Sequence, residues 1–496
     1  MSKKLSLLDA VLIVSGSMIG SGIFIVTAEM SQNLGSAGWV LLAWVITGLF
    51  TLLGALTYGE LAGMMPKAGG QYMYIKRAFG RLTGFVYGWT VFTVIQTGVI
   101  AAVAMAFAKY LGVFEPTLGD GEKGILFNIG GAEGYHFTRG KIVAIILVLF
   151  LTWVNSRGVE QGKWIQRIFT FAKLLALFGL IICGLYFATQ FDFFKNNWAH
   201  AWEASTWHSG ENTMPLEMAH WENISGWGIA TAMGIAMVGS LFSSDAWNNV
   251  TFIAGDIENP SKNIPRALFT GTLIVTIIYI LANVAYLSLL PIKGSLIPGI
   301  DGQGISNALN SRVGSAAASV IMGKNGELLM AALIMVSTFG CNNGLILSGA
   351  RFYKAMADDG LFFKKAAVLN NKQVPANALW IQGVWASVLC LSGSYNQLLD
   401  YCIFAALIFY IITAASLFVL RKREPNADRP YKVIGYPFVP AIFIGIAIFV
   451  GVDIFWFKTI TASIGLGIVA LGIPVFYFIE KHELIANFHS INYLIE

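Results

Sequence analysis

The chain has little charge. Charged residues make up only 12% of its 496 residues, whereas soluble domains carry about 25%. Histidine is scarce as well, and none is placed in an apolar segment, where it might relay protons. All six histidines fall in predicted loops or in the tail: His136, His200, His208, His220, His482 and His489. The sequence therefore disfavours a soluble enzyme, and we expect neither a metal nor a cofactor.

Cysteine is nearly absent from the polar segments. All four cysteines fall in apolar runs: Cys183, Cys341, Cys390 and Cys402. A disulfide framework in the outer loops is therefore excluded, and we expect all four to be buried packing residues. A Walker A phosphate loop is also missing, so nothing in the sequence suggests transport driven by ATP.

Long apolar runs are what the sequence has in abundance. Its mean hydropathy is +0.67 and 56% of its residues are hydrophobic. A helix of about 20 apolar residues spans a bilayer, and runs of this kind predict a single all-α membrane domain with twelve spans. We place the spans at residues 8–33, 38–65, 82–112, 140–156, 164–189, 226–254, 265–291, 326–356, 376–394, 397–421, 436–457 and 460–480.

The positions of the basic residues predict the orientation. The first apolar run begins at Leu5 without a cleavable signal peptide, which favours a cytoplasmic N-terminus. With that orientation most of the 32 Lys and Arg residues fall in inner segments, as the positive-inside rule requires. We therefore expect both termini in the cytoplasm and a location in the cell membrane. The net charge of +5 follows from the inner loops and does not indicate a nucleic-acid partner.

Two polar segments between the spans are long enough to have a structure of their own. The outer loop, residues 190–225, is acidic and rich in tryptophan, and it could be a solvated cap or a lid that shapes access. Residues 66–80 are too polar to span, so we expect a short amphipathic element in the inner membrane interface.

The first span is interrupted by the sequence SGSMIGSGIF, residues 15–24. Glycine costs about 1 kcal/mol relative to alanine inside a helix, and lipid cannot satisfy the backbone of a broken helix. Such a break is therefore expected only beside a cavity. The sixth span is interrupted in the same way by GSLFSSDAW, residues 239–247.

Breaks in spans one and six are typical of transporters built from inverted repeats. We expect a first five-helix repeat over residues 8–189 and a second over residues 226–421, with two further helices over residues 436–480.

Seven stretches together resemble the amino acid/polyamine/organocation superfamily, and within it the bacterial relatives of the L-type amino acid transporters. They cover almost the whole chain: GSMIGSGIF, YGELAGMMPKAGGQYMYIKRAFG, FTFAKLLAL, LFSSDAWNNV, IENPSKNIPRAL, STFGCNNGLILSGARFYKAMADDGL and LFVLRKREPNADRPYKVIGYPFVP. The resemblance implies the leucine-transporter fold and sodium-independent movement of amino acids by alternating access.

The chain departs from the animal L-type transporters in two places. Those transporters carry a cysteine between spans three and four that binds a glycoprotein subunit, but residues 112–141 contain none. We therefore expect no disulfide-linked ancillary subunit. The animal transporters usually have glycine where this chain has Asp245, which leaves the preferred side chain of the substrate open.

A zwitterionic amino acid needs donors for its carboxylate. Free amides at the start of a half-helix suit an anion, and the backbone of the first break supplies them. We assign this role to Ser17, Ile19, Gly20, Ser21 and Gly22. The alternative is that the glycines serve close packing between helices.

The ammonium group needs acceptors, and the second break offers carbonyls at Phe242, Ser243 and Asp245. The Phe242 ring is also a candidate outer gate, or else one packing residue among many. Asp245 itself could cap the broken helix, contact the substrate or carry a proton. Asn248, Asn342 and Asn343 are expected to add polar lining, whereas Glu60 is expected to pair with basic residues of the inner loops.

Lys173 lies deep in the fifth span. Because placing a charge at this depth of the membrane costs free energy, we expect Lys173 to have a functional role. By resemblance, it occupies the place where sodium-coupled relatives bind sodium. Its ammonium could bond the unwound carbonyls of span one and the hydroxyls of Ser337 or Thr338. The alternative is a lysine that extends to the membrane surface.

The function that these features favour is sodium-independent transport of neutral L-amino acids, as exchanger or facilitator. Alternatives within transport are proton coupling through Lys173 or Asp245, and cationic amino acids or polyamines as substrates. Two other classes of membrane protein are disfavoured. A sensor would usually carry a soluble output domain, and an intramembrane enzyme would need a nucleophile–base pair that no motif in the sequence supports.

Overall fold

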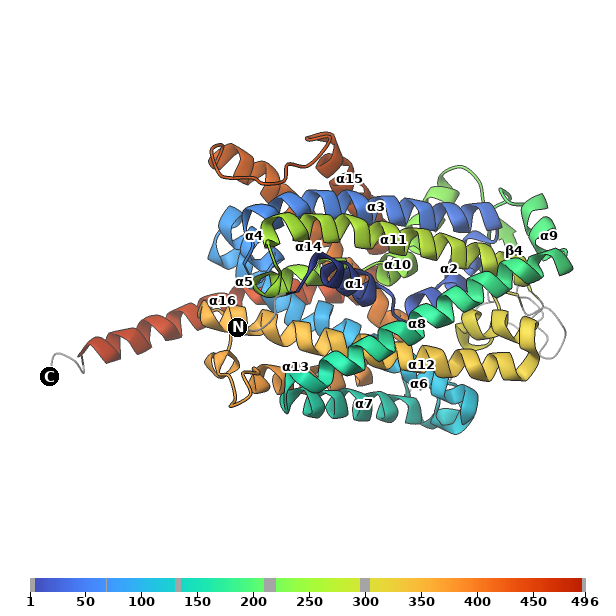
Figure 1. Ribbon diagram of the computed structural model, residues 1–496, viewed down its shortest axis with the longest axis horizontal. Coiled ribbons are helices and arrows are strands. Elements are labelled where there is room, and N and C mark those ends of the chain that lie inside the picture. Colours follow the sequence, from blue (N-terminus) through green and yellow to red (C-terminus); the bar gives the residue numbers. More distant parts are fainter. Residues whose placement is uncertain (1–4, 68, 130–134, 209–219, 295–303, 493–496) are drawn as a thin grey trace.

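The computed structural model describes residues 5–67, 69–129, 135–208, 220–294 and 304–492. The helices form one bundle with a common long direction (Figure 1). Within the described residues, ten helices are long and apolar enough to cross a membrane by length and composition. Two shorter apolar helices, α1 (Leu7–Met18) and α13 (Ala376–Ser392), complete the twelve predicted spans. The prediction of an all-α polytopic membrane protein is confirmed.

The spans follow the predicted order. The first consists of α1, the single turn η1 (Gly22–Phe24) and α2 (Thr27–Leu34), and the sixth of α10 (Trp227–Ser243) and η7 (Trp247–Asp256). The third joins α5 (Arg81–Thr90) to α6 (Gln96–Phe114) through a π-helical turn, η2 (Val91–Ile95). The others are α3 (Ala37–Met64), α7 (Arg139–Ser156), α8 (Val159–Phe187), α11 (Pro260–Leu289), α12 (Val313–Asp358), α13, α14 (Tyr395–Arg423), α15 (Phe438–Phe457) and α16 (Thr459–Asn492).

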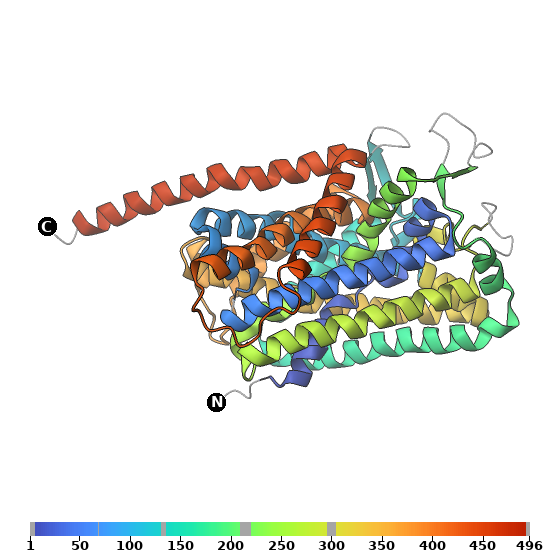
Figure 2. The ribbon, with the colours of Figure 1, turned by 90° about the horizontal axis from the view of Figure 1, so that it is seen from above.

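Two spans are longer than predicted. Helix α12 begins at Val313 and continues past a bend at Gly323, whose φ of 59° needs a residue without a side chain. Helix α16 continues to Asn492 and extends beyond the bundle in two perpendicular views (Figures 1 and 2). The beginning of α1 and the end of α16 lie towards the same end of the bundle, opposite α9 (Phe193–Ala199) (Figure 1).

The polar segment after span two contains a short helix with one buried face, as predicted, and its place at the membrane interface stays a prediction. It forms α4 (Gln71–Phe79), which packs against α5 and α14 and buries Tyr72 and Tyr74. The Gln71 amide donates to the Tyr58 and Thr413 hydroxyls. Through these hydrogen bonds Gln71 connects α4 to the buried hydroxyls of α3 and α14.

The outer loop is pinned to the ends of several spans. Besides α9 it contains the strands β3 (Ser205–His208) and β4 (His220–Asn223), which pair antiparallel. The Asn197 amide donates to the carbonyls of Leu287 and Leu290 at 2.8 and 2.9 Å, and the Gly38 amide donates to the Ala201 carbonyl. These contacts favour a fixed cap over a freely moving lid.

The cysteines differ from the prediction at one position. Cys341, Cys390 and Cys402 are buried, but Cys183 is exposed on α8. Only about a third of the most apolar stretch of α8 is buried by protein, so most of that stretch faces the membrane. A cysteine is tolerated on such a surface because it behaves as a small apolar residue.

Glu60 is fully buried near the predicted inner end of α3 and is paired as predicted. The Arg421 guanidinium donates to both of its carboxylate oxygens, at 2.9 and 2.5 Å. The Arg429 side chain lies 3.2 Å away and the Val433 amide donates at 2.8 Å. Glu60 therefore fastens α3 to α14 and to the segment that follows it.

We predict that Glu60→Gln lowers the thermal stability of the detergent-solubilised protein substantially. Breaking a buried ion pair costs about 3–5 kcal/mol, because the remaining charges lose their partner. The matched control is Arg77→Gln, which breaks the exposed pair with Glu424 and should cost no more than about 1 kcal/mol. Equal unfolding temperatures for the two variants, measured by loss of the monodisperse peak on heating, would refute this assignment.

Candidate functional site

The break in span one exposes a row of amides. Helix α1 ends at Met18, and the Ile19 amide is the last to bond back along it. Among the described residues, no group accepts from the amides of Gly20, Ser21 or Gly22. Unpaired buried amides are rare in proteins. Three in succession at a helix break therefore indicate a site for an anionic group.

Several carbonyls of the same break accept hydrogen bonds from side chains of other spans. The Lys173 ammonium, 3% exposed, donates to the carbonyls of Gly16 and of Ile19, the latter at 3.0 Å. The Tyr286 hydroxyl donates to the Ile23 carbonyl at 3.2 Å, and the Tyr110 hydroxyl to the Phe24 carbonyl at 2.9 Å. Lys173 therefore makes the predicted contact with span one.

Tyr279 lies between the two breaks. Its hydroxyl is 2.9 Å from the Met18 carbonyl in span one and 3.0 Å from the Ser243 carbonyl in span six. A phenol has one proton to donate, so the two carbonyls share it. This single side chain from α11 couples the position of one break to that of the other.

The break in span six leaves fewer free groups than predicted. Helix α10 ends at Ser243, and Ala246 takes a left-handed conformation with φ 63° before η7 begins. The Phe242 carbonyl accepts from the Asp245 amide, and the Ser243 carbonyl from Tyr279. Of the three predicted ammonium acceptors, only the Asp245 carbonyl accepts no bond from the described residues.

The two breaks meet at a close backbone contact. A Cβ atom on Gly22 would lie 2.1 Å from the Ser243 hydroxyl oxygen and 3.0 Å from its Cα. Only glycine allows span one to approach span six so closely. We call the space beside this contact the upper chamber. Its lining residues are Ser17, Met18, Gly20, Ser21, Gly22, Val99, Val103, Phe242, Ser243, Asp245, Ala246, Cys341 and Leu345.

Aromatic side chains close one side of the upper chamber. The Phe242 ring, 7% exposed, packs edge-on against the Tyr395 ring with centroids 6.0 Å apart. The Tyr395 hydroxyl lies 3.4 Å from that of Ser21. The predicted gate residue therefore lies at the chamber beside a second aromatic residue that the sequence did not indicate.

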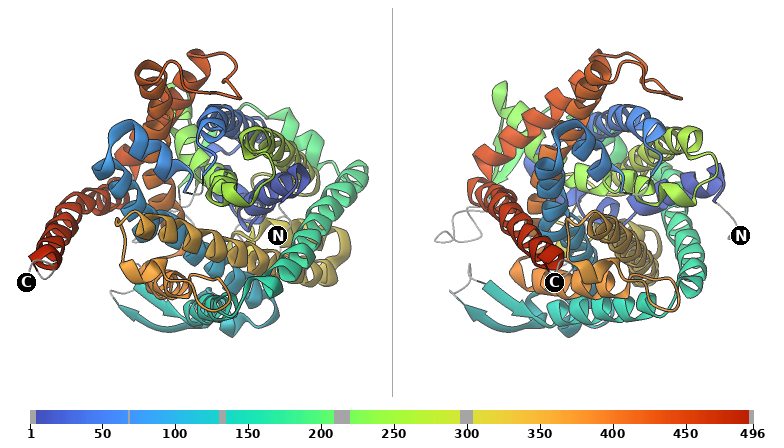
Figure 3. Two further views of the ribbon diagram at one scale, coloured as in Figure 1. Left: turned by 60° about the vertical axis from the view of Figure 1, so that its left-hand side comes forward. Right: turned by 90° about the vertical axis from the view of Figure 1, so that its left-hand side faces the viewer.

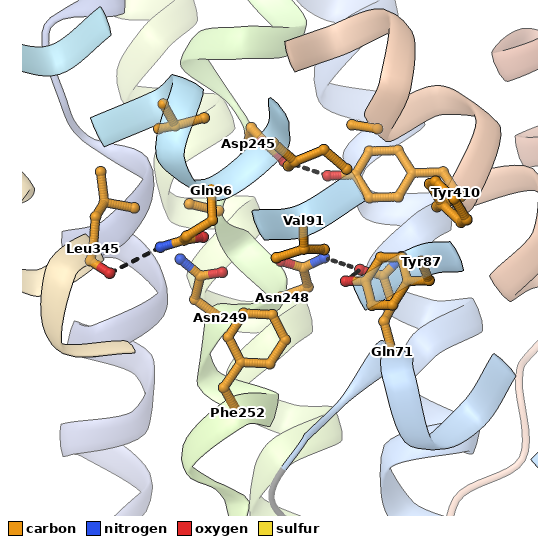
Figure 4. Close-up of a pocket in the computed structure, with 15 residues that line it drawn as sticks. Gln71, Tyr87, Val91, Gln96, Asp245, Asn248, Asn249, Phe252, Leu345 and Tyr410 are labelled. Atoms are coloured by element: carbon orange, nitrogen blue, oxygen red, sulfur yellow. Dashed lines mark hydrogen bonds between the residues drawn. The ribbon is translucent and has the colours of Figure 1, made fainter. Parts of the chain in front are cut away.

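A second space, the lower chamber, shares Val99, Asp245, Ala246 and Leu345 with the upper one and is lined by amide and phenol groups (Figure 4). Its hydrogen-bonding residues are Gln71, Tyr87, Gln96, Asn248, Asn249 and Tyr410. Asp245 lies where the two chambers meet, and its carboxylate accepts a hydrogen bond from the Tyr410 hydroxyl (Figure 4).

An ion cluster joins the predicted outer ends of three spans. The Lys458 ammonium, in the turn between α15 and α16, lies 2.8 Å from the Asp400 carboxylate of α14 and 3.4 Å from that of Glu29 on α2. The outer half of span one is thereby tied to α14, on the same side of the protein as the Phe242–Tyr395 contact.

Four of the predicted polar residues do not reach these chambers. The Thr338 hydroxyl donates to carbonyls of its own helix, and that of Ser337 has no partner among the described residues. Lys173 therefore does not bond them, contrary to our expectation. Asn342 and Asn343 are fully buried and line neither chamber; the Asn343 oxygen accepts from Asn155 instead.

The residues that sequence reasoning missed are mainly tyrosines and glutamines. Tyr279, Tyr395 and Tyr410 are three of 17 tyrosines, and no local pattern distinguishes them. Gln71 and Gln96 carried a weak signal, since a glutamine within an apolar run is costly unless its amide has a partner. Gln96 has one in the Leu345 carbonyl.

The chain matches a family model described as "Amino acid permease" over residues 5–478. It is 30% identical to the "Serine/threonine exchanger SteT" of Bacillus subtilis, over 97% of this chain and 98% of the relative. It is 30% identical to the mouse "Large neutral amino acids transporter small subunit 2", over 96% of this chain and 81% of the relative. Similarity to the mouse "b(0,+)-type amino acid transporter 1" is 29%, over 90% and 82%.

We predict that Gly22→Ala destabilises the protein, because its Cβ would overlap Ser243. Overpacking of this kind typically costs about 1–3 kcal/mol. The control is Gly179→Ala on α8, where nothing lies within 4 Å of the added atom and alanine should be neutral or stabilising. The unfolding temperature in detergent should fall for Gly22→Ala and should stay unchanged or rise for Gly179→Ala. An unchanged unfolding temperature of Gly22→Ala would contradict the close contact.

Proposed function

Because the chain belongs to the amino acid permease family, we propose that it transports neutral L-amino acids across the membrane by sodium-independent exchange. The observation that carries the proposal is the set of amides at Gly20, Ser21 and Gly22 that are unpaired among the described residues and that lie in one chamber with Asp245, whose carbonyl accepts no bond from them either. Donors for a carboxylate and an acceptor for an ammonium group are thus available within one small space.

In this proposal the two breaks bind the part that all amino acids share. The substrate carboxylate accepts from the amides of Gly20, Ser21 and Gly22, where the partial positive charge of the half-helix adds to the hydrogen bonds. The ammonium group donates to the Asp245 carbonyl and shares those of Phe242 and Ser243, since each carbonyl has a second lone pair. Ser17 and Ile19 shape the start of the break.

Lys173 takes the structural place of a coupling ion in this proposal. Its ammonium fixes the Gly16 and Ile19 carbonyls and so keeps the next amides directed into the chamber. A fixed positive charge at this position makes a bound sodium ion unnecessary. Ser337 and Thr338 remain near the break on α12 as helix packing residues and not as ligands of Lys173.

The lower chamber is the place for the substrate side chain. Its amides and phenols favour side chains that form hydrogen bonds without carrying charge, such as those of serine, threonine or glutamine. The relatives named for serine/threonine exchange and for large neutral amino acids are consistent with this class.

Cationic amino acids are the second candidate class, because the Asp245 carboxylate lines both chambers. In the alternative of proton symport, the same carboxylate would gain and lose a proton. We favour neutral substrates because the Tyr410 hydroxyl already donates to this carboxylate and so satisfies part of its charge.

The remaining parts of the proposal concern the setting of the transporter. No catalytic residue is required, since the substrate is moved unchanged. We place the chain in the cell membrane with both termini cytoplasmic and two five-helix repeats related by inversion. We further propose that it works without a disulfide-linked ancillary subunit, because residues 112–141 contain no cysteine.

We predict that the purified protein in sodium-free liposomes takes up a labelled neutral L-amino acid, and that unlabelled neutral amino acid inside accelerates the uptake. Competition by all twenty amino acids gives the side-chain preference. Absence of uptake for every amino acid would refute the proposal.

Two further arms of the same assay separate the alternatives. Accumulation driven by an imposed pH gradient would establish proton symport instead of exchange. Strong competition by lysine in the wild type that disappears in Asp245→Asn would establish cationic substrates, whereas neutral substrates should compete in both proteins.

A further inference from the structure

The segment between α6 and α7 contains a β-hairpin with two different faces. Strand β1 (Ile125–Ile129) pairs antiparallel with β2 (Tyr135–Thr138), with Phe127 opposite Phe137 and Ile129 opposite Tyr135. Because side chains alternate along a strand, these four share one face. The rings of Phe127 and Phe137 stack with centroids 4.8 Å apart.

The opposite face is more polar from Asn128 onward, whereas the exposed Leu126 lies at the irregularity in β1 between Ile125 and Phe127. Asn128 lies opposite His136 in the register, and the Asn128 side-chain oxygen is 2.7 Å from a ring nitrogen of His136. The hairpin is therefore amphipathic, with an aromatic face and a face that carries hydrogen-bonding groups.

The described part of the chain covers the β2 side of the aromatic face in part, since Tyr135 and Phe137 are half-buried, and leaves the β1 side open. The Phe127 side chain is 50% exposed and that of Ile129 is 62% exposed. A two-stranded hairpin is only marginally stable in water by itself, and an apolar face left open usually marks a binding surface. Because the described residues leave Phe127 and Ile129 open, this end of the hairpin needs a further apolar contact if it is to stay folded.

The position of the hairpin indicates what covers it. Thr138, the last residue of β2, caps the first turn of α7, so the hairpin lies where a membrane span begins. In the view along the long axis of the bundle, the strands lie at the edge of the molecule, outside α7 (Figure 3). Because the hairpin lies outside the helix bundle at the end of a membrane span, we infer that lipid lies next to it.

The neighbouring surface of α7 is itself directed to lipid. Ile142, Ile146 and Phe150 form an exposed apolar stripe at helical spacing, with exposed fractions of 38, 61 and 47%. The Lys141 ammonium lies 3.9 Å from the centre of the Tyr135 ring. Lys141 is buried, so this contact packs the Tyr135 ring on the start of α7, and a tyrosine at the end of a span is typical of the level of the lipid headgroups.

We propose that the aromatic face of the β1–β2 hairpin inserts into the nearer lipid leaflet, at the boundary between headgroups and acyl chains. The hairpin continues the lipid-facing surface of α7, and the lipid supplies the apolar cover that the described residues do not give to Phe127 and Ile129. The hairpin then acts as an interfacial anchor for the start of span four. A protein partner on this face is the competing outcome.

The test compares neighbouring positions on the two faces. Ile129→Cys and Asn128→Cys, each in a Cys183→Ala background that removes the exposed native thiol, are labelled with an environment-sensitive fluorophore and reconstituted into phosphatidylcholine liposomes. Quenching is measured with lipids that carry a nitroxide close to the headgroup and, separately, with iodide in water.

We expect the lipid nitroxide to quench the Ile129 probe several-fold more than the Asn128 probe, and iodide to show the reverse order. Phe127→Cys, on the same face as Ile129, should repeat the Ile129 pattern. Two outcomes would overturn the proposal: equal quenching by iodide at both positions, which places the face in water, and protection of the Ile129 probe from both quenchers, which indicates a protein partner.

Discussion

The structure depends on how backbone groups are satisfied where a helix is broken inside a membrane. Lipid offers no hydrogen bonds, so each carbonyl and amide freed by a break needs a partner from the protein or from a bound solute. Around the break in span one, Lys173, Tyr279, Tyr286 and Tyr110 serve the carbonyls. Among the described residues, the amides of Gly20–Gly22 have no such partner. The break in span one thus leaves amides free to attract an anion, and the break in span six leaves the Asp245 carbonyl free to accept from a cation.

In the proposed mechanism the two breaks act as one site because they are held in contact. Gly22 lets span one approach Ser243, and Tyr279 bonds to carbonyls of both breaks. A solute that binds the amides therefore meets the groups of span six at a fixed distance. At the predicted outer end, the Lys458 cluster ties α2 to α14, so rearranging the first span requires breaking specific ionic contacts.

The sequence predicted features that disturb an otherwise apolar pattern. Both breaks were visible because glycine, serine and aspartate interrupt long runs, and Lys173 and Glu60 because isolated charges in such runs need partners. Tyr279 and Tyr410 were not visible, since their role follows from three-dimensional position alone. Thr338 was assigned wrongly because a hydroxyl in a helix can bond to its own backbone. The buried partners of Gln71 on α4 were not visible in the sequence, because they come from distant helices.

The central claim is that Lys173 holds the amides of the first break ready for a substrate without sodium. Hydrogen–deuterium exchange of the peptide that contains Gly20–Gly22 tests it directly, in sodium-free liposomes with and without a neutral L-amino acid. The account predicts that substrate slows exchange of these amides in the wild type and that Lys173→Met abolishes the slowing. Slowing that requires sodium in the wild type, or that persists in Lys173→Met, would contradict it.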